Sequence, residues 1–276
     1  MKTRRITTIR IIFGRAGIDN QRVNKAAIDC LSGWLFSMLL VSVAQAASDE
    51  FPQRIDGDIG FGGYYTHSII RGKSNVLSVL PYADFEYGRM FARVDTLGIK
   101  TLKLGYGHLE LAGRISQDGF STNTPGLQGL GKRETSIPLG IGTLQVTPIG
   151  GFWINAFHDV HRSKGNWFEM IYGGEIDMSR VTFYPLLGAD YQSAEYVRYY
   201  YGISAQEAAS SQYAAYQPAG ALNGLIGLIA DIRFAEGYHL NCYVRRKWLG
   251  DAIQHSPIVS QGYLDTGYLS LSYRFK

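Results

Sequence analysis

The sequence predicts an all-β protein: an antiparallel transmembrane β-barrel of a bacterial outer membrane, with about twelve strands. Three observations support this fold class. The N-terminus carries an export signal, and the last strand alternates apolar with polar residues. After residue 46, the sequence has no apolar run of the ~20 residues that a transmembrane helix needs. A Tyr- and Gly-rich exported chain of this kind suits a barrel, because alternation dilutes its apolar residues.

The first 46 residues show the three parts of a secretory signal. Basic residues come first, an apolar run follows at 30–43, and Ala44 and Ala46 then occupy the positions that a signal peptidase reads. We expect cleavage after Ala46, so that 1–46 is a signal peptide and 47–276 a single outer-membrane β-barrel domain. An N-terminal membrane anchor is the alternative, but the apolar run is short for it. The basic region is long, so the true start codon could lie downstream.

Removal of the signal also changes the charge. The full chain has 27 Lys+Arg and 23 Asp+Glu, but residues 1–46 hold seven basic and two acidic residues, so the remainder has a net charge of −1. The basic pI is therefore no argument for nucleic-acid binding, and we expect no nucleic-acid partner. Cys242 is the one cysteine after the signal. We therefore expect no intramolecular disulfide, no cysteine-based metal site and no cofactor.

Alternation and turn residues place the strands in order. The first has Ile59, Phe61 and Tyr65 on one face, and later strands are separated by glycines, by the tight turn at 178–180 and by polar loops. The expected strands are 56–70, 76–87, 89–94, 98–104, 108–115, 135–142, 145–158, 166–177, 181–192, 220–233, 238–248 and 263–275. The short strands within 89–104 could merge, which would give ten.

The connections between these strands sort by length. The long ones at 116–134, 193–218 and 249–262 fall on one side, and the tight ones at 88, 105–107, 178–180 and 234–237 fall on the other. Outer-membrane barrels have short periplasmic turns and longer external loops. A secreted β-sandwich or lipocalin-like barrel, which is the soluble alternative, need not sort its loops in this way.

The last strand is the clearest single element. Leu269, Leu271, Tyr273 and Phe275 share one face, and the polar residues between them share the other. We expect this strand to close the barrel, with those four side chains toward lipid and the polar face toward a wet interior.

Four blocks of the mature chain resemble the MipA/OmpV family of outer-membrane proteins. They are Val79–Gly88 with Leu97–Lys100, Glu195–Ser204 with Ala205–Ala208, Leu249–Ala252 with Ser256–Val259, and the ending Leu271–Phe275. They occur in the family's order over most of the mature chain. Lys276 departs from the family pattern, in which the chain usually stops at Phe.

The resemblance implies a barrel of twelve or ten strands with a non-enzymatic role. The namesake member is described as a scaffold that joins a lytic murein transglycosylase to a penicillin-binding protein, and other members are linked to adhesion. The family implies no catalytic residues. The expected partners are outer-membrane lipid, the barrel-assembly machinery and these two murein enzymes. A small channel and a surface adhesin are the alternatives, and a rim-active hydrolase is a remote one.

Three groups of residues are candidates for a functional site. His158, Asp159 and His161 at the external rim could activate a water, but a solvated polar loop is the simpler interpretation. The charged Asp84, Glu86, Arg93, Asp95, Arg245 and Lys247 are expected to face the interior, as paired filler or else as a pore lining, which leaves Arg246 on the wrong face. Tyr196, Tyr199, Tyr200 and Tyr201 could bind sugars, but an interface girdle with loop packing is favoured.

Overall fold

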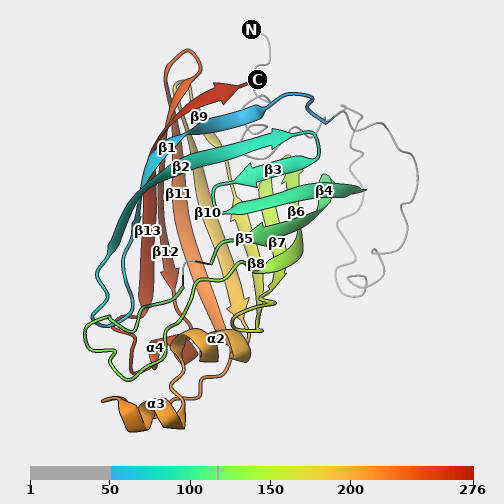
Figure 1. Cartoon of the computed structure of the whole chain (residues 1–276). Helices are drawn as coiled ribbons and strands as arrows, with labels where there is room; N and C mark the ends of the chain where they lie inside the picture. Colours follow the sequence, from blue (N-terminus) through green and yellow to red (C-terminus); the bar gives the residue numbers. More distant parts are fainter. Residues whose placement is uncertain (1–50, 117) are drawn as a thin grey trace, which may run out of the picture.

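The computed structural model describes residues 51–116 and 118–276, so the expected signal peptide with Ala44 and Ala46 lies outside the described residues. Most of the described chain is β-strand (Figure 1). The strands are β1 (Asp56–Thr66), β2 (Val76–Tyr87), β3 (Met90–Arg93), β4 (Thr96–Leu104), β5 (Gly107–Arg114), β6 (Leu139–Thr147), β7 (Gly150–His158), β8 (Asn166–Gly173), β9 (Ile176–Met178), β10 (Val181–Gln192), β11 (Ala221–Ala235), β12 (Tyr238–Trp248) and β13 (Tyr263–Phe275). The helices are α2 (Ala194–Tyr201), α3 (Ala205–Ser210) and α4 (Asp251–Gln254). In the described part of the chain, no helix is both long and apolar enough to cross a membrane.

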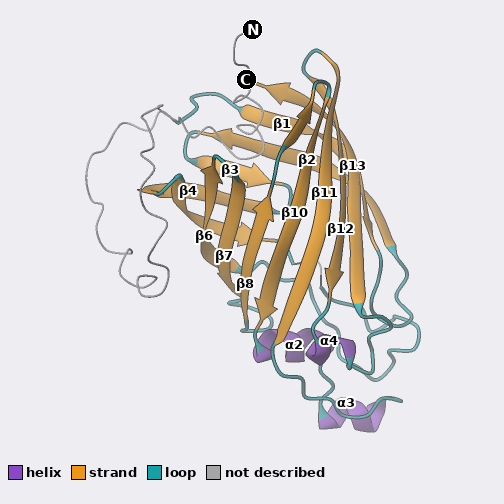
Figure 2. Ribbon diagram, turned by 180° about the vertical axis from the view of Figure 1, so that it is seen from behind, coloured by secondary structure: helices purple, strands orange, loops and turns teal. Residues whose placement is uncertain are grey.

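The antiparallel sheet closes on itself (Figures 1 and 2). Strands β1 to β8 pair in chain order, β10 pairs with β8 and β11, and β13 pairs with both β12 and β1. Strand β9 pairs with the start of β10 and β8 pairs with its end, so β8 and β9 fill one place in the barrel. The described strands therefore form a closed barrel of twelve strands, and the predicted fold class is confirmed.

The interruption between β8 and β9 has a backbone cause. We expected one strand over 166–177, and the structure divides it at 174–175. Pro185 on β10 accepts a hydrogen bond from the N–H of Gly174 at 3.0 Å, but it has no N–H to donate in return. The missing donor interrupts the ladder at this point.

The predicted boundaries of the next hairpin were wrong. We expected strands at 135–142 and 145–158, whereas β6 continues to Thr147 and β7 starts at Gly150. The turn uses Pro148, which has no N–H, and it ends at Gly150, whose φ is 133°. Gly142 does not end a strand. It lies inside β6, where a Cβ would meet the Oδ1 atom of Asn155 at 2.1 Å.

Strand β13 illustrates how the barrel sorts its side chains. Leu269, Leu271, Tyr273 and Phe275 are 38–54% exposed, whereas Ser270, Ser272 and Arg274 are at most 6% exposed. Because strand side chains alternate, the apolar set lies on the outer surface and the polar set lies inside. That the four apolar residues contact lipid in the closing strand remains a prediction.

The two ends of the barrel differ in their connections. At one end, which we call the turn end, two-residue turns join the strands, and Gly88 and Gly105 take positive φ values of 56° and 54° there. At the opposite end, the loop end, lie the long connections with α2, α3 and α4 (Figure 1). The C-terminus lies at the turn end. By the pattern of outer-membrane barrels, the turn end faces the periplasm and the loop end faces outside.

The long connections fold over the loop end as a cap, by which we mean residues 67–75, 118–138, 193–220 and 249–262. Their apolar side chains form a buried cluster of their own, which includes Ile70, Phe120, Leu127, Val197, Ile203, Ile253 and Ile258. The prediction placed 67–70 and 135–138 in strands, which the structure does not bear out, and treated most of the remainder as polar loops. The cap therefore adds a packed structure that strand alternation does not reveal.

Candidate functional site

The charged side chains inside the barrel are joined in ion pairs. Arg93 binds Glu110 through two N–O contacts of 2.7 Å, and Lys100 Nζ lies 2.5 Å from Glu86 Oε1. The other close pairs are Arg114–Glu169 at 2.8 Å, Lys247–Asp190 at 3.0 Å, and Arg274 with Asp58 at 2.6 Å and with Asp231 at 2.8 Å. The prediction that Glu86, Arg93 and Lys247 serve as paired interior filler is confirmed.

The other predicted interior charges have looser contacts. Asp84 lies opposite Arg93 in the β2–β3 register. Asp95 Oδ1 lies 3.7 Å from Arg114 Nε, and Arg245 donates from Nε to the hydroxyl of Thr266 at 3.2 Å. A cavity of about 220 Å³ remains among them, lined by Arg93, Arg114, Arg245, Tyr64, Tyr243 and Tyr268.

The outward position of Arg246 has a simple explanation. Its guanidinium forms a bidentate pair with Asp265 on β13, with N–O distances of 2.8 and 2.7 Å. It also lies over the ring of Tyr263, 4.3 Å from the centroid. These contacts lie near the loop end of β12, where a charged side chain reaches the interface instead of the apolar band.

Tyr196, Tyr200 and Tyr201 pack inside the cap, so the loop-packing part of the prediction holds for them and the girdle part is wrong. Helix α2 turns Tyr196, Tyr200 and Tyr201 inward, and each is at most 4% exposed. The hydroxyls of Tyr196 and Tyr201 donate to the carboxylate of Asp118 at 2.8 and 2.7 Å. Burial raises the pKa of all three tyrosines, that of Tyr200 to about 12. They join the helix to the loop that contains Asp118.

Beneath these tyrosines the cap meets the barrel interior. A cavity of about 100 Å³ is bordered by Tyr200 and Tyr201 from the cap and by Arg114, Arg245 and Lys247 from the strands. Tyr200 also donates to Ser136 Oγ at 3.0 Å. The polar interior therefore ends against an apolar, hydrogen-bonded cap at the loop end.

His158, Asp159 and His161 do not form a catalytic arrangement. The carboxylate of Asp159 accepts hydrogen bonds from three backbone N–H groups, those of His161, Arg162 and Ser163, and from the Ser163 hydroxyl. Burial alone would raise the pKa of Asp159, but these donors lower it to about 2. His158 Nδ1 instead contacts Asn166 Oδ1 at 2.9 Å. In the described residues, no group of three or more His, Cys, Asp or Glu is placed to hold a metal ion.

The outer surface of the cap carries a groove of about 790 Å³ with a mixed polar and apolar lining. Its lining includes Tyr199, Arg198, Arg133, Gln206 and Glu207. Glu207 accepts from Arg133 at 2.8 Å and also closes a reciprocal capping box with Ser204 at the start of α3. The sequence Ser204-Ala205-Gln206-Glu207 carries the S-x-x-E signature of this box, a helix signal that strand-based reasoning missed.

The turn end presents apolar side chains on a rigid support. Ile149 and Tyr106 lie in two neighbouring turns and are 73% and 51% exposed. Gln145 on β6 fixes the first of these turns, because its Oε1 accepts from Tyr106 N at 2.8 Å and its Nε2 donates to Leu104 O at 2.9 Å. Tyr172 donates to the carbonyl of Ile149 at 2.6 Å. Sequence reasoning placed Tyr106 in the tight turn at 105–107 but missed Ile149, because it ran the strand 145–158 through the second turn.

Comparison with known proteins agrees with this architecture. The model of the family described as "MltA-interacting protein MipA" matches residues 59–275. Over 221 residues the chain is 25% identical to a protein of Escherichia coli (strain K12) named YiaT, covering 79% of this chain and 90% of the relative. It is 28% identical to the outer membrane protein Omp26La of Vibrio anguillarum, over 60% of this chain and 61% of that protein. It is also 28% identical to the outer membrane protein OmpV of Vibrio cholerae, over 52% and 56% of the two chains.

Proposed function

Because this chain belongs to the MltA-interacting protein MipA family of outer membrane proteins, we propose that it is a non-enzymatic outer-membrane scaffold. In this proposal, its periplasmic turn end binds a lytic murein transglycosylase and holds it, together with a penicillin-binding protein, at the membrane. The barrel-assembly machinery inserts the chain, and bilayer lipid surrounds it.

The proposal rests on the two neighbouring turns at the turn end that contain Tyr106 and Ile149. A docking surface needs exposed apolar side chains whose position is set before the partner arrives, since ordering them on binding would cost affinity. Ile149 and Tyr106 meet this requirement, because Gln145 and Tyr172 hold the backbone of their turns. Short turns can therefore still present a contact surface.

The interior and the cap also favour a structural role over transport. Ion pairs occupy much of the space between the strands, and the cap packs an apolar cluster over the loop end. The relatives are named as outer membrane proteins and not as enzymes.

The test is copurification from crosslinked envelopes. The wild-type protein should bring down a lytic transglycosylase, and the double variant Tyr106→Ser with Ile149→Ser should lose it while it still assembles. The double variant Ile137→Ser with Leu139→Ser at the loop end is the matched control, because both side chains are also more than half exposed. If no murein enzyme copurifies with the wild-type chain, the scaffold role fails.

The groove on the cap favours a second candidate function, that of a surface adhesin. A groove of about 790 Å³ that combines charged side chains with a half-buried aromatic residue, Tyr199, suits an extended ligand with polar and apolar faces, such as a glycan. Binding of whole cells to host matrix or glycan arrays, lost in Tyr199→Ala, would favour this function over the scaffold.

A further inference from the structure

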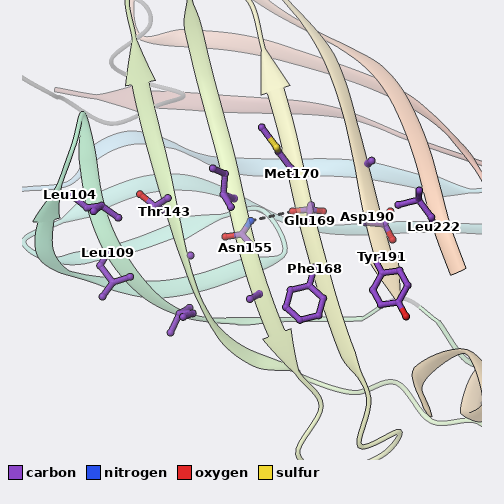
Figure 3. A pocket seen from close by; sticks show the side chains of 15 residues that line it. Leu104, Leu109, Thr143, Asn155, Phe168, Glu169, Met170, Asp190, Tyr191 and Leu222 are labelled. Carbon is purple, nitrogen blue, oxygen red and sulfur yellow. Dashed lines mark hydrogen bonds between the residues drawn. The ribbon is translucent and has the colours of Figure 1, made fainter. Parts of the chain in front are cut away.

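The outer surface of the barrel has an apolar groove of about 470 Å³ (Figure 3). Phe168 and Tyr191, whose ring centroids are 6.4 Å apart, stand along it, and the small side chains of Ala156 and Ala189 leave it open. The hydroxyl of Thr143, a polar group in the lining, donates to the carbonyl of His108 at 2.8 Å. The groove is therefore suited to an apolar ligand that packs along its side chains.

The groove runs across the barrel from Leu104 and Leu109, near the β4–β5 turn, to Tyr191 and Leu222 near the loop end, and at β7 and β8 it lies close to the loop end. Ala156 and Phe168 are paired in the β7–β8 ladder, and the next outward pair is His158 and Asn166, the last residues of that ladder. Two residues along a strand span about 7 Å, so the groove starts that far below the tip of the β7–β8 hairpin. At this depth it faces the hydrocarbon of the outer leaflet.

The hairpin tip above the groove carries cationic and titratable side chains. His161, Arg162 and Lys164 follow His158, and the acidic residue among them, Asp159, is buried and satisfied by backbone donors. Arg162 pairs with Glu134. Lys164, whose Nζ also contacts the carbonyl of Val160, and the two histidines are exposed and have no carboxylate partner among the described ion pairs. The positive charge of the hairpin tip is therefore complementary to the negative charge of a phosphate group.

We propose that this groove is a lipid site that holds one acyl chain of a phosphorylated glycolipid of the outer leaflet, with a phosphate of its headgroup against His158, His161 and Lys164. Bulk lipid is as apolar as the groove, so apolar transfer alone gives no preference for one lipid. Selectivity comes from close packing of a chain between Phe168 and Tyr191 combined with a charged contact at the hairpin tip above it. The scaffold proposal plays no part in this argument.

Lipid A is the probe that tests the site. The delipidated full-length mature protein in detergent is mixed with hexa-acylated lipid A, and native mass spectrometry counts the bound molecules. One lipid A should be retained by the wild type, and Ala156→Phe and Ala189→Phe should each lower the bound fraction at least tenfold. Ala230→Phe is the matched control, because Ala230 lies on the outward side of β11 and does not line the groove.

A second pair of measurements separates the headgroup from the chain. The double variant His161→Gln with Lys164→Gln should weaken binding of lipid A and leave binding of dephosphorylated lipid A unchanged. The proposal is overturned if the groove-filling variants retain lipid A as the wild type does, or if phosphatidylglycerol binds as tightly as lipid A. It is also overturned if filling the groove removes only a dimer, since a second copy of the chain would then be the occupant. Ala189→Val replaces any phenylalanine variant that does not show the heat-dependent gel shift of a folded barrel.

Discussion

The guanidinium of Arg274 on the last strand forms a bidentate pair with the carboxylate of Asp58 on the first strand, with both N–O distances at 2.6 Å. The two residues are direct partners in the β1–β13 register, and both side chains are 4% exposed. Arg274 also reaches Asp231 on β11, which in turn contacts His239 on β12. One arginine therefore links the strands on both sides of the seam that closes the barrel.

We expect Arg274→Gln to lower the free energy of unfolding by ~3–5 kcal/mol, because it leaves buried carboxylates without their counter-charge. Urea unfolding, followed by the heat-dependent gel shift, measures this change. The exposed pair Arg246–Asp265 provides the control, and Arg246→Gln should cost no more than ~1 kcal/mol. Equal losses of free energy of unfolding in the two variants would show that the buried pair Arg274–Asp58 stabilises the barrel no more than an exposed pair does.

Leu271→Arg should destabilise the inserted barrel by ~2–4 kcal/mol if Leu271 faces lipid near the middle of the membrane. Folding into lipid vesicles at graded urea concentrations measures this change in stability. Ile137→Arg, in a loop-end connection, should cost little, since charges near the interface are tolerated. Normal insertion of the Leu271 variant would contradict the lipid-facing assignment of Leu269, Leu271, Tyr273 and Phe275.

Phe275→Ala should reduce the amount of assembled protein in envelopes, and deletion of Lys276 should not. Phe275 pairs with Gly57 on β1 and makes an edge-to-face contact with Tyr273, with ring centroids 5.0 Å apart, whereas Lys276 follows the last strand residue. Immunoblots of heated and unheated outer membranes measure the assembled fraction. The reverse result would mean that the terminal lysine, and not the aromatic ring, is needed for assembly.

The loop 159–165 should lose its protection in acid between about pH 4 and pH 2. The pKa of Asp159 falls from 3.8 to about 2 in the folded protein, so its contribution to stability is complete above pH 4 and is lost as the carboxylate becomes protonated near pH 2. Hydrogen exchange of the loop amides against pH measures the loss. Asp159→Asn should abolish this step, and His161→Ala should keep it, because the backbone N–H of residue 161 still donates.

Asp118→Ala should loosen the cap, because it leaves the hydroxyls of Tyr196 and Tyr201 unpaired inside an apolar cluster, at ~1–3 kcal/mol for each buried group. In planar bilayers the wild-type protein should show no steady conductance, and the variant should show openings. Tyr213→Phe, a change at the edge of the cluster, is the control. Steady conductance of the wild type would instead favour the channel alternative.

Much of the barrel could be predicted from local pattern alone. Strands β2, β10, β12 and β13 begin and end at the predicted residues, because their alternation is regular and turn residues flank them. The prediction failed where one residue type can have two structural roles. Gly142 indicates a turn in the sequence, but in the structure it allows close contact between strands. Pro185 interrupts the pairing of a neighbouring strand that looks continuous in the sequence. The groove in Figure 3 was not predicted, because its residues come from strands that only the closed sheet brings together.

The sequence by itself determined the class of barrel, a strand number of twelve or ten, the sorting of long and short connections, and the inward side of most charges. Each of these follows from a period of two and from turn chemistry, which act over a few residues. Only the tertiary structure decided which charges pair, where Tyr196 to Tyr201 lie, and that the long connections form a cap. Those outcomes depend on contacts such as that between Arg274 and Asp58, 216 residues apart, and closure of the sheet creates them.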